Sequence, residues 1–119
     1  MISKEEVLHQ HYLNNLVKRL ATVGEAVKDI RSIITEPVWF EHGRQHELCD
    51  LILLYDDFSA TAIELKGSIK RRDKARHQMR SGGDYIKDVL HYNFRYGLFV
   101  VYNKDINTYH WERIDRSLL

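Results

Sequence analysis

The stretch that decides the fold runs from Asp50 to Lys66 and reads DLILLYDDFSATAIELK. An apolar run follows the aspartate, and the sequence DDFS at residues 56–59 then supplies residues that are common in turns. A second run, rich in apolar and β-branched residues, leads to the lysine. Two strand-like runs separated by a turn predict a β-hairpin, with strands over residues 48–55 and 60–67.

The part of the chain before the hairpin has the pattern of a helix. Ser3 and Glu6 stand at capping-box spacing, and apolar residues recur at helical intervals through residues 13–34. Thr22 and Glu25 form a second capping-box pair, and Gly24 lies between them. A helix break near residues 21–24 is therefore possible, and the segment is either one helix or two. The only proline of the chain marks the end of the helix, and residues 38–40 predict a first short strand.

A second helix follows the hairpin. Apolar residues keep one helical phase over residues 75–90, straight through Gly82 and Gly83, and a glycine on the buried side lets a helix approach a sheet closely. Residues 96–102 are dense in apolar side chains and residues 108–114 alternate, which predicts two further strands. The order helix, three strands, helix, two strands predicts an α/β fold with a central mixed sheet flanked by helices.

Composition limits the class of protein. With 119 residues, of which 44% are apolar, residues 1–119 have the size of one domain with its own core. The single cysteine excludes an intramolecular disulfide, and no apolar run approaches the ~18 residues that span a bilayer. Acidic residues stand near the N-terminus, where a signal peptide is basic. We therefore expect a cytoplasmic protein without a membrane segment.

Charge is divided unevenly along the chain. Residues 1–65 hold 6 Lys and Arg against 11 Asp and Glu, whereas residues 66–119 hold 12 against 6. The densest basic stretch includes the start of the second helix, with Asp73 as its only acidic residue. Such a strip is either a solvated helix face or a surface for nucleic-acid phosphates. Its candidate phosphate contacts are Lys70, Arg71, Arg72, Lys74, Arg76 and Arg80.

Two carboxylates and a lysine are expected to meet at one end of the hairpin. Side chains alternate along a strand, so Glu64 and Lys66 share one face, and the hairpin pairing brings Asp50 close to both. Two carboxylates this close repel unless a cation lies between them, and hard oxygen ligands suit Mg²⁺. With the Leu65 carbonyl as a further ligand, Mg²⁺ would polarise a phosphate and acidify a water, while Lys66 stabilises transition-state charge. The alternative interpretation is an ion pair beside a β-hairpin.

These residues carry a resemblance to a known family. Asp50, the hairpin, the sequence IELK at residues 63–66 and the basic helix containing Gln78 resemble the PD-(D/E)XK nuclease superfamily. The layout over residues 22–114 is most similar to that of the small archaeal-type Holliday junction resolvases. Cys49 stands where the family pattern has a proline, which is a weak position of the motif. The resemblance implies a restriction-endonuclease-like αβββαβ core.

The resemblance also implies roles for single residues. Asp50 and Glu64 would be metal ligands, and Lys66 the catalytic lysine. Gln78 falls on the sheet-facing side of its helix. A polar amide there is either a satisfied core group or, as in the family, a contact to the active site or to DNA.

A third acidic ligand is expected from the first helix. The family often adds a glutamate about two dozen residues before the aspartate, and Glu25 has that spacing. In one continuous helix Glu25 would project away from the apolar stripe, as a solvated or capping residue. Glu5, Glu6 and His9 lie nearer the stripe and are rival candidates. Some branches of the family use a helical histidine as a metal ligand.

We therefore expect a Mg²⁺-dependent DNA endonuclease, with Mn²⁺ able to replace Mg²⁺ and without a nucleotide cofactor. The resemblance to resolvases extends this expectation to branched or junction DNA. The chain is too small to enclose a duplex alone, which favours a homodimer. The alternative is a non-catalytic nucleic-acid-binding or assembly protein that keeps the fold, and the intact set of Asp, Glu and Lys argues against it.

Overall fold

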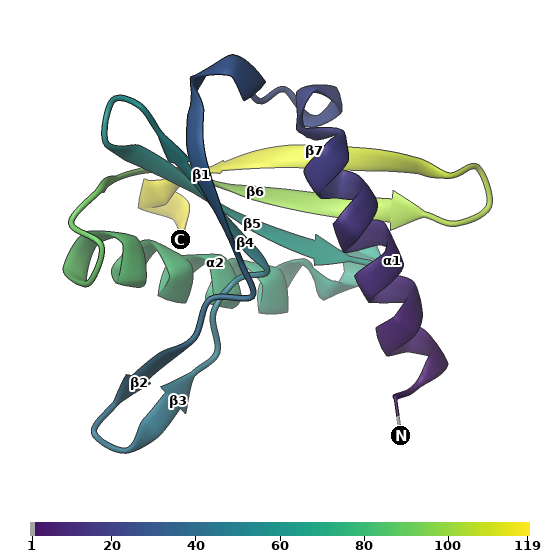
Figure 1. Cartoon of the computed structure of the whole chain (residues 1–119). Helices are drawn as coiled ribbons and strands as arrows, with labels where there is room; N and C mark the ends of the chain where they lie inside the picture. The colour runs from purple at the N-terminus through teal and green to yellow at the C-terminus, as the bar shows by residue number, and fades with distance from the viewer. Residues whose placement is uncertain (1) are drawn as a thin grey trace.

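The central sheet of the computed structural model, which describes residues 2–119, has five strands in the order β1-β4-β5-β6-β7 (Figure 1). β5 and β6 run parallel and the other neighbouring pairs are antiparallel, so the sheet is mixed. Helices α1 (Lys4–Lys18) and α2 (Arg72–Asp88) cover its opposite faces, which confirms the α/β class predicted from the sequence. The strands are β1 (Ile30–Thr35), β4 (Leu51–Tyr55), β5 (Ser59–Lys66), β6 (Asn93–Asn103) and β7 (Thr108–Asp115).

Each helix packs an apolar stripe on its own face of the sheet. α1 buries Leu13 and Leu16 against β4, β5 and β6. α2 buries Met79 in a second cluster on the other face. Gly82 faces the sheet closely, because a Cβ added there would lie 2.6 Å from the Cys49 sulfur and 3.4 Å from the Cβ of Ala62 in β5. The glycine therefore permits the close helix–sheet approach that its position on the buried stripe predicts.

The segment between α1 and the hairpin departs from the predicted helix. α1 ends at Lys18, and two 3₁₀ turns follow, η1 (Leu20–Val23) and η2 (Val27–Asp29). Gly24 lies between the turns with φ of 80°, a left-handed conformation that ends a helix. Residues 30–34 then pair with β4 as part of β1, because β-branched residues suit a strand as well as their spacing suits a helix. The break near residues 21–24 is confirmed, and the helix predicted up to residue 34 is wrong.

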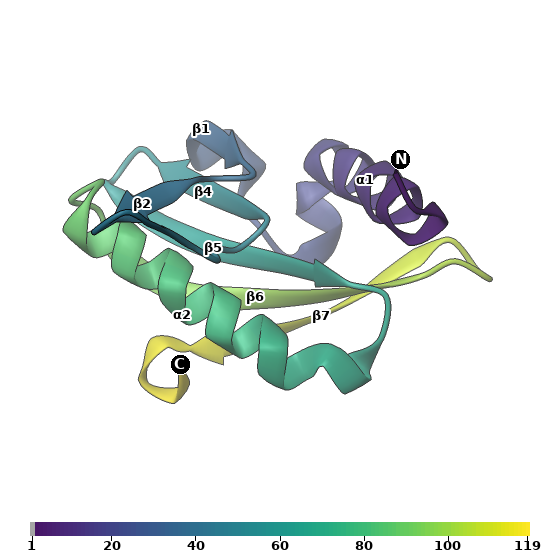
Figure 2. The same ribbon diagram turned by 90° about the horizontal axis from the view of Figure 1, so that it is seen from below.

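Residues 38–40 do not contribute a strand to the central sheet. β2 (Trp39–Glu41) pairs only with β3 (Arg44–His46), and this two-stranded ribbon projects from the sheet (Figures 1 and 2). The tryptophan of β2 stacks on the histidine of β3 and lies 5.9 Å from the ring of Tyr85 in α2, which fixes the ribbon to the body. The first strand of the sheet is therefore β1, and the prediction for residues 38–40 holds only locally.

The second half of the chain follows the prediction. The β4–β5 hairpin forms with Leu51 opposite Ile63, and α2 continues through both glycines after a 3₁₀ turn, η3 (Ile69–Arg71). β6 and β7 form the second hairpin, and a last 3₁₀ turn, η4 (Arg116–Leu118), follows. Within residues 2–119, no helix has the length and apolar character needed to cross a membrane.

Candidate active site

The candidate active site lies where β4 begins and β5 ends. Because Leu51 pairs with Ile63, Asp50 comes opposite Glu64. The backbone N–H of Asp50 donates to Glu64 Oε1 at 3.0 Å, and the backbone N–H of Leu65 donates to Asp50 Oδ2 at 2.8 Å. These reciprocal bonds hold the two carboxylates beside each other, in the arrangement that the hairpin pairing predicts.

Glu64 is almost completely buried. Only 1% of its side chain is exposed, and its Oε2 atom has no hydrogen-bond partner among residues 2–119. The Lys66 ammonium lies at ion-pair distance, 3.2 Å from this oxygen, and is itself mostly buried. Burial raises the pKa of Glu64 far above its ordinary value, and the Asp50 carboxylate adds to the rise. Lys66 therefore does not by itself compensate the burial of an ionised Glu64, and a cation bound beside Glu64 would favour its carboxylate form.

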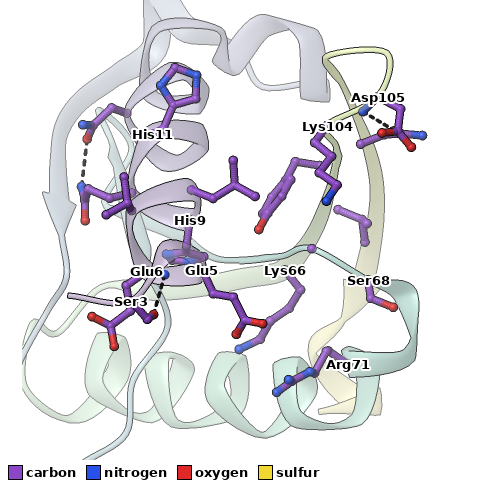
Figure 3. Close-up of a pocket in the computed structure, with 18 of the residues that line it drawn as sticks. Ser3, Glu5, Glu6, His9, His11, Lys66, Ser68, Arg71, Lys104 and Asp105 are labelled. Atoms are coloured by element: carbon purple, nitrogen blue, oxygen red, sulfur yellow. Dashed lines mark hydrogen bonds between the residues drawn. The ribbon is translucent and has the colours of Figure 1, made fainter. Parts of the chain in front are cut away.

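His9 of α1 contacts one of the two carboxylates, that of Asp50. Its Nε2 atom lies 3.3 Å from Asp50 Oδ2 and 3.1 Å from the Leu65 carbonyl oxygen. Figure 3 shows His9 on α1 and Lys66 at the end of β5, both lining the groove that opens beside the site. One imidazole nitrogen thus links the start of β4, the end of β5 and the helix that covers them.

The contact of His9 distinguishes it from the other α1 candidates. In the described part of the chain, neither the Glu5 nor the Glu6 side chain forms a hydrogen bond to a residue of the site, although both side chains line the same groove. A sequence signal for His9 exists, because it precedes the buried Leu13 by four residues and Leu16 by seven. That spacing places it on the stripe of α1 that faces the sheet.

The pairing of His9 with Asp50 shifts the pKa values of both groups. The hydrogen bond to Asp50 raises the pKa of His9, although burial acts in the opposite direction. Burial alone would raise the pKa of Asp50, but hydrogen bonds with His9, Glu64 and the Leu65 N–H lower it below its ordinary value. A protonated imidazole next to an ionised aspartate is therefore favoured, and a metal ion must compete with that proton.

Oxygen atoms are the groups of this site that could hold a metal ion. The Asp50 and Glu64 carboxylates and the Leu65 carbonyl are hard oxygen ligands, and Mg²⁺ is usually held by few such ligands and keeps several waters. His9 Nε2 lies against two of them, Asp50 Oδ2 and the Leu65 carbonyl oxygen, so the imidazole positions these two atoms. Within residues 2–119, no three His, Cys, Asp or Glu side chains form a complete metal cluster.

Glu25 does not belong to this cluster. It lies in the loop after η1 and is buried, with 5% of its surface exposed. One carboxylate oxygen accepts the hydroxyl of Tyr55, and the other accepts the hydroxyl of Tyr96 at 2.7 Å. Tyr55 ends β4, at the opposite end from Asp50 and roughly 17 Å away at about 3.3 Å per residue. The metal-ligand role expected for Glu25 is wrong, and so is the alternative of a solvated or capping residue.

Glu25→Ala is expected to destabilise the fold without removing the chemistry of the site. Two tyrosine hydroxyls would lose their acceptor at a buried position, which costs about 1–3 kcal/mol of unfolding free energy. Urea denaturation measures this loss, and metal binding by the folded fraction is the control. A variant with normal stability and abolished metal binding would restore Glu25 as a ligand.

Gln78 reaches the segment before Asp50 and not the carboxylates. Its side-chain Nε2 donates to Glu47 Oε1 at 3.2 Å, while its Oε1 atom is buried without a partner among residues 2–119. The amide therefore ties the middle of α2 to the chain that leads into β4. A contact of Gln78 with DNA stays a prediction.

The basic strip is divided between paired and unpaired side chains. Arg72 makes two hydrogen bonds to Glu112, at 3.1 and 2.7 Å. Arg76 donates to the backbone carbonyl of Leu118, and Lys74 lies 3.8 Å from Glu47. The exposed members of the strip that form no ion pair within residues 2–119 are Lys70, Arg71 and Arg80. These three exposed charges have no acidic partner and are available to a phosphate, and the partly buried Arg76 also forms no ion pair within residues 2–119.

Comparison with known proteins adds no family to this geometry, since no protein-family model and no curated protein matches the chain. The site is therefore interpreted from its own chemistry. That chemistry is two neighbouring carboxylates, a lysine paired with one of them, and a histidine that contacts the other carboxylate and the Leu65 carbonyl.

Proposed function

We propose that the chain is a divalent-metal-dependent nuclease that hydrolyses DNA phosphodiester bonds, built on a restriction-endonuclease-like αβββαβ core. The observation that carries the proposal is the meeting of Asp50, Glu64 and Lys66 at one end of the hairpin, where the buried Glu64 Oε2 has the Lys66 ammonium beside it but no hydrogen-bond partner among residues 2–119. The resemblance of this part of the sequence to the PD-(D/E)XK superfamily supports it. The mixed sheet with a helix on each face is compatible with that core.

The residues of the site divide the work between them. Asp50, Glu64 and the Leu65 carbonyl would hold Mg²⁺ or Mn²⁺, and the bound ion supplies the charge that polarises a phosphate and acidifies a water. Lys66 places a positive donor beside the same carboxylates, where it stabilises the charge that develops on the phosphate oxygens. His9 fixes Asp50 and the Leu65 carbonyl in their relative positions through one nitrogen.

Burial of like charges distinguishes this proposal from the alternative of a non-catalytic binding protein. A binding surface gains nothing from an acidic group such as Glu64 enclosed beside Asp50, because both carboxylates repel a phosphate. The alternative predicts DNA binding without cleavage. The homodimer expected from the small size of the chain stays a prediction, which sedimentation of the purified protein tests.

The proposal is tested with a panel of end-labelled DNA molecules of one sequence: single strand, duplex, flap and four-way junction. We expect at least one of them to be cut in Mg²⁺ or Mn²⁺ and none in the presence of a chelator. Binding of the panel without cleavage in either metal would favour the non-catalytic alternative.

Salt dependence tests which side chains contact DNA. Substitution of both Lys70 and Arg80 by alanine should weaken binding to all duplex sequences alike. It should also flatten the slope of log affinity against log salt by about 0.9 for each phosphate that is no longer neutralised. Arg72→Ala is the control, because it removes one positive charge from a side chain already paired with Glu112, and the effects are compared per charge removed. A larger effect in the control would show that the DNA path follows the paired side chains instead.

A further inference from the structure

A large groove opens directly beside Lys66. It has a volume of about 1490 Å³ and lies between the N-terminal half of α1, η3 and the β6–β7 hairpin (Figure 3). Pockets for small molecules usually measure about 300–1,000 Å³, so this space suits part of a polymer better than a metabolite. The inference drawn from it rests on the proposed nuclease function and concerns the form of the DNA.

The two walls of the groove carry opposite charge. Arg71 of η3 and Lys104 of the β6–β7 hairpin lie on one side, with Lys66 at the base, and Asp105 follows Lys104 at the hairpin tip. The first turn of α1 faces them with Glu5 and Glu6 (Figure 3). A sugar–phosphate backbone is therefore attracted to the hairpin side and repelled from the α1 side.

The α1 wall also contains an apolar hollow. It measures about 400 Å³, and four of its five lining residues also line the groove. Two of them are unusually exposed for apolar side chains, Ile2 at 69% and Val7 at 58%. His11 stands one helical turn after Val7 and offers an aromatic ring at the same place. An apolar hollow edged by an imidazole fits the flat face of a nucleobase.

We propose that the groove binds an unpaired segment of the DNA strand next to the scissile phosphate. Its phosphates lie along Arg71 and Lys104, and an unpaired base enters the hollow beside Val7 and His11. A continuous duplex cannot occupy the groove in this way. Its bases are stacked and paired, and its second strand brings phosphates toward Glu5 and Glu6. The preferred substrates therefore have unpaired nucleotides beside the point of cleavage.

The test compares a flap with a continuous duplex of the same sequence, in wild type and in groove variants. We expect wild type to cut the flap more efficiently. The double variant Val7→Asn with His11→Ala should reduce cleavage of the flap by about 5- to 150-fold, the size of one base stack, and affect the duplex little. Lys104→Glu should act in the same direction. Lys18→Glu, at the far end of α1, is the matched control and should change neither substrate.

Equal cutting of flap and duplex by wild type, or groove variants that behave like the control, would overturn the inference. Absence of cutting on every DNA is a failure of the nuclease proposal instead. In that case fluorescence anisotropy with a labelled single strand and a labelled duplex decides the inference. The groove variants must then weaken binding of the single strand selectively, and equal weakening of both DNA forms contradicts the inference.

Discussion

Glu64→Gln is expected to reduce DNA cleavage by about a thousandfold or more while the chain stays folded. Metal-ion stabilisation of transition-state charge is worth several kcal/mol, and each 1.36 kcal/mol corresponds to a factor of ten in rate. The amide retains an oxygen that can accept the Asp50 N–H but has lost the negative charge that a cation requires. The measurement is a single-turnover cleavage rate at saturating Mg²⁺.

The same substitution has a pH signature in the metal-free protein. The folded pKa of Glu64 is raised, so the unfolding free energy is highest while Glu64 is protonated. This contribution to stability is lost as pH rises from about 4.3 toward the folded pKa. Glutamine has no proton to lose, so Glu64→Gln should show a smaller decline of unfolding free energy between pH 5 and pH 8 in chelator. His9 adds a decline of the same sign above about pH 6.5, which the variant keeps. Asp50, with a lowered pKa, matters only in more acidic solution.

Lys66→Met separates metal binding from chemistry. The methionine keeps an apolar stem and removes the ammonium from Glu64 Oε2. Mg²⁺ should still raise the melting temperature of this variant, by mass action on the folded state, while cleavage is lost. Lys70→Met is the matched control, because Lys70 is exposed and lies outside the carboxylate cluster. Cleavage at the wild-type rate by Lys66→Met contradicts the role assigned to the lysine.

His9→Ala is expected to lower cleavage about 10- to 100-fold, the usual effect of removing a group that orients metal ligands. The loss should appear as weaker metal binding, with more Mg²⁺ needed for half-maximal rate, since Asp50 and the Leu65 carbonyl lose their common partner. The conservative variant His9→Gln can restore a donor near the Nε2 position and should recover part of the rate.

The pH profile shows whether His9 acts in this way or only supports the fold. Its pKa is raised by Asp50, so the imidazolium persists to a higher pH than usual and disfavours a metal ion beside it. Wild-type cleavage at limiting Mg²⁺ should therefore increase as pH rises through neutrality. His9→Gln cannot titrate, and its profile should be flatter over the same range. Parallel profiles for the two proteins would reduce His9 to a packing residue.

The parts of the fold that sequence predicts are those set by local pattern. The hairpin of β4 and β5 is fixed by two apolar runs around one turn, and α2 by a single phase that runs through Gly82. Residues 30–34 form a strand although Ile30 and Ile34 fit helical spacing, because their pairing with β4 depends on residues 18 or more positions away. Gly24 turns the chain after η1. The spacing of residues in the sequence does not show in which direction the chain continues from there.

The candidate site also has a part that the local sequence pattern predicts and a part that depends on how the elements pack. Asp50, Glu64 and Lys66 come together through strand alternation and hairpin register, both of which are local. His9 contacts Asp50, 41 residues later in the chain, and Leu65, 56 residues later. These contacts depend on how α1 crosses the sheet. Glu25 has the right spacing but lies at the other end of β4, because α1 ends before reaching it.

The most direct test of the central claim is a time course of cleavage by wild type and Glu64→Gln, purified side by side, on one labelled flap DNA. Protein and DNA are mixed beforehand, with protein in excess over DNA so that each molecule turns over once, and Mg²⁺ is added at time zero. The account predicts product that grows with time and with Mg²⁺ concentration for wild type, and none above the chelator control for Glu64→Gln. Intact DNA with wild type, or equal product from both proteins, contradicts it.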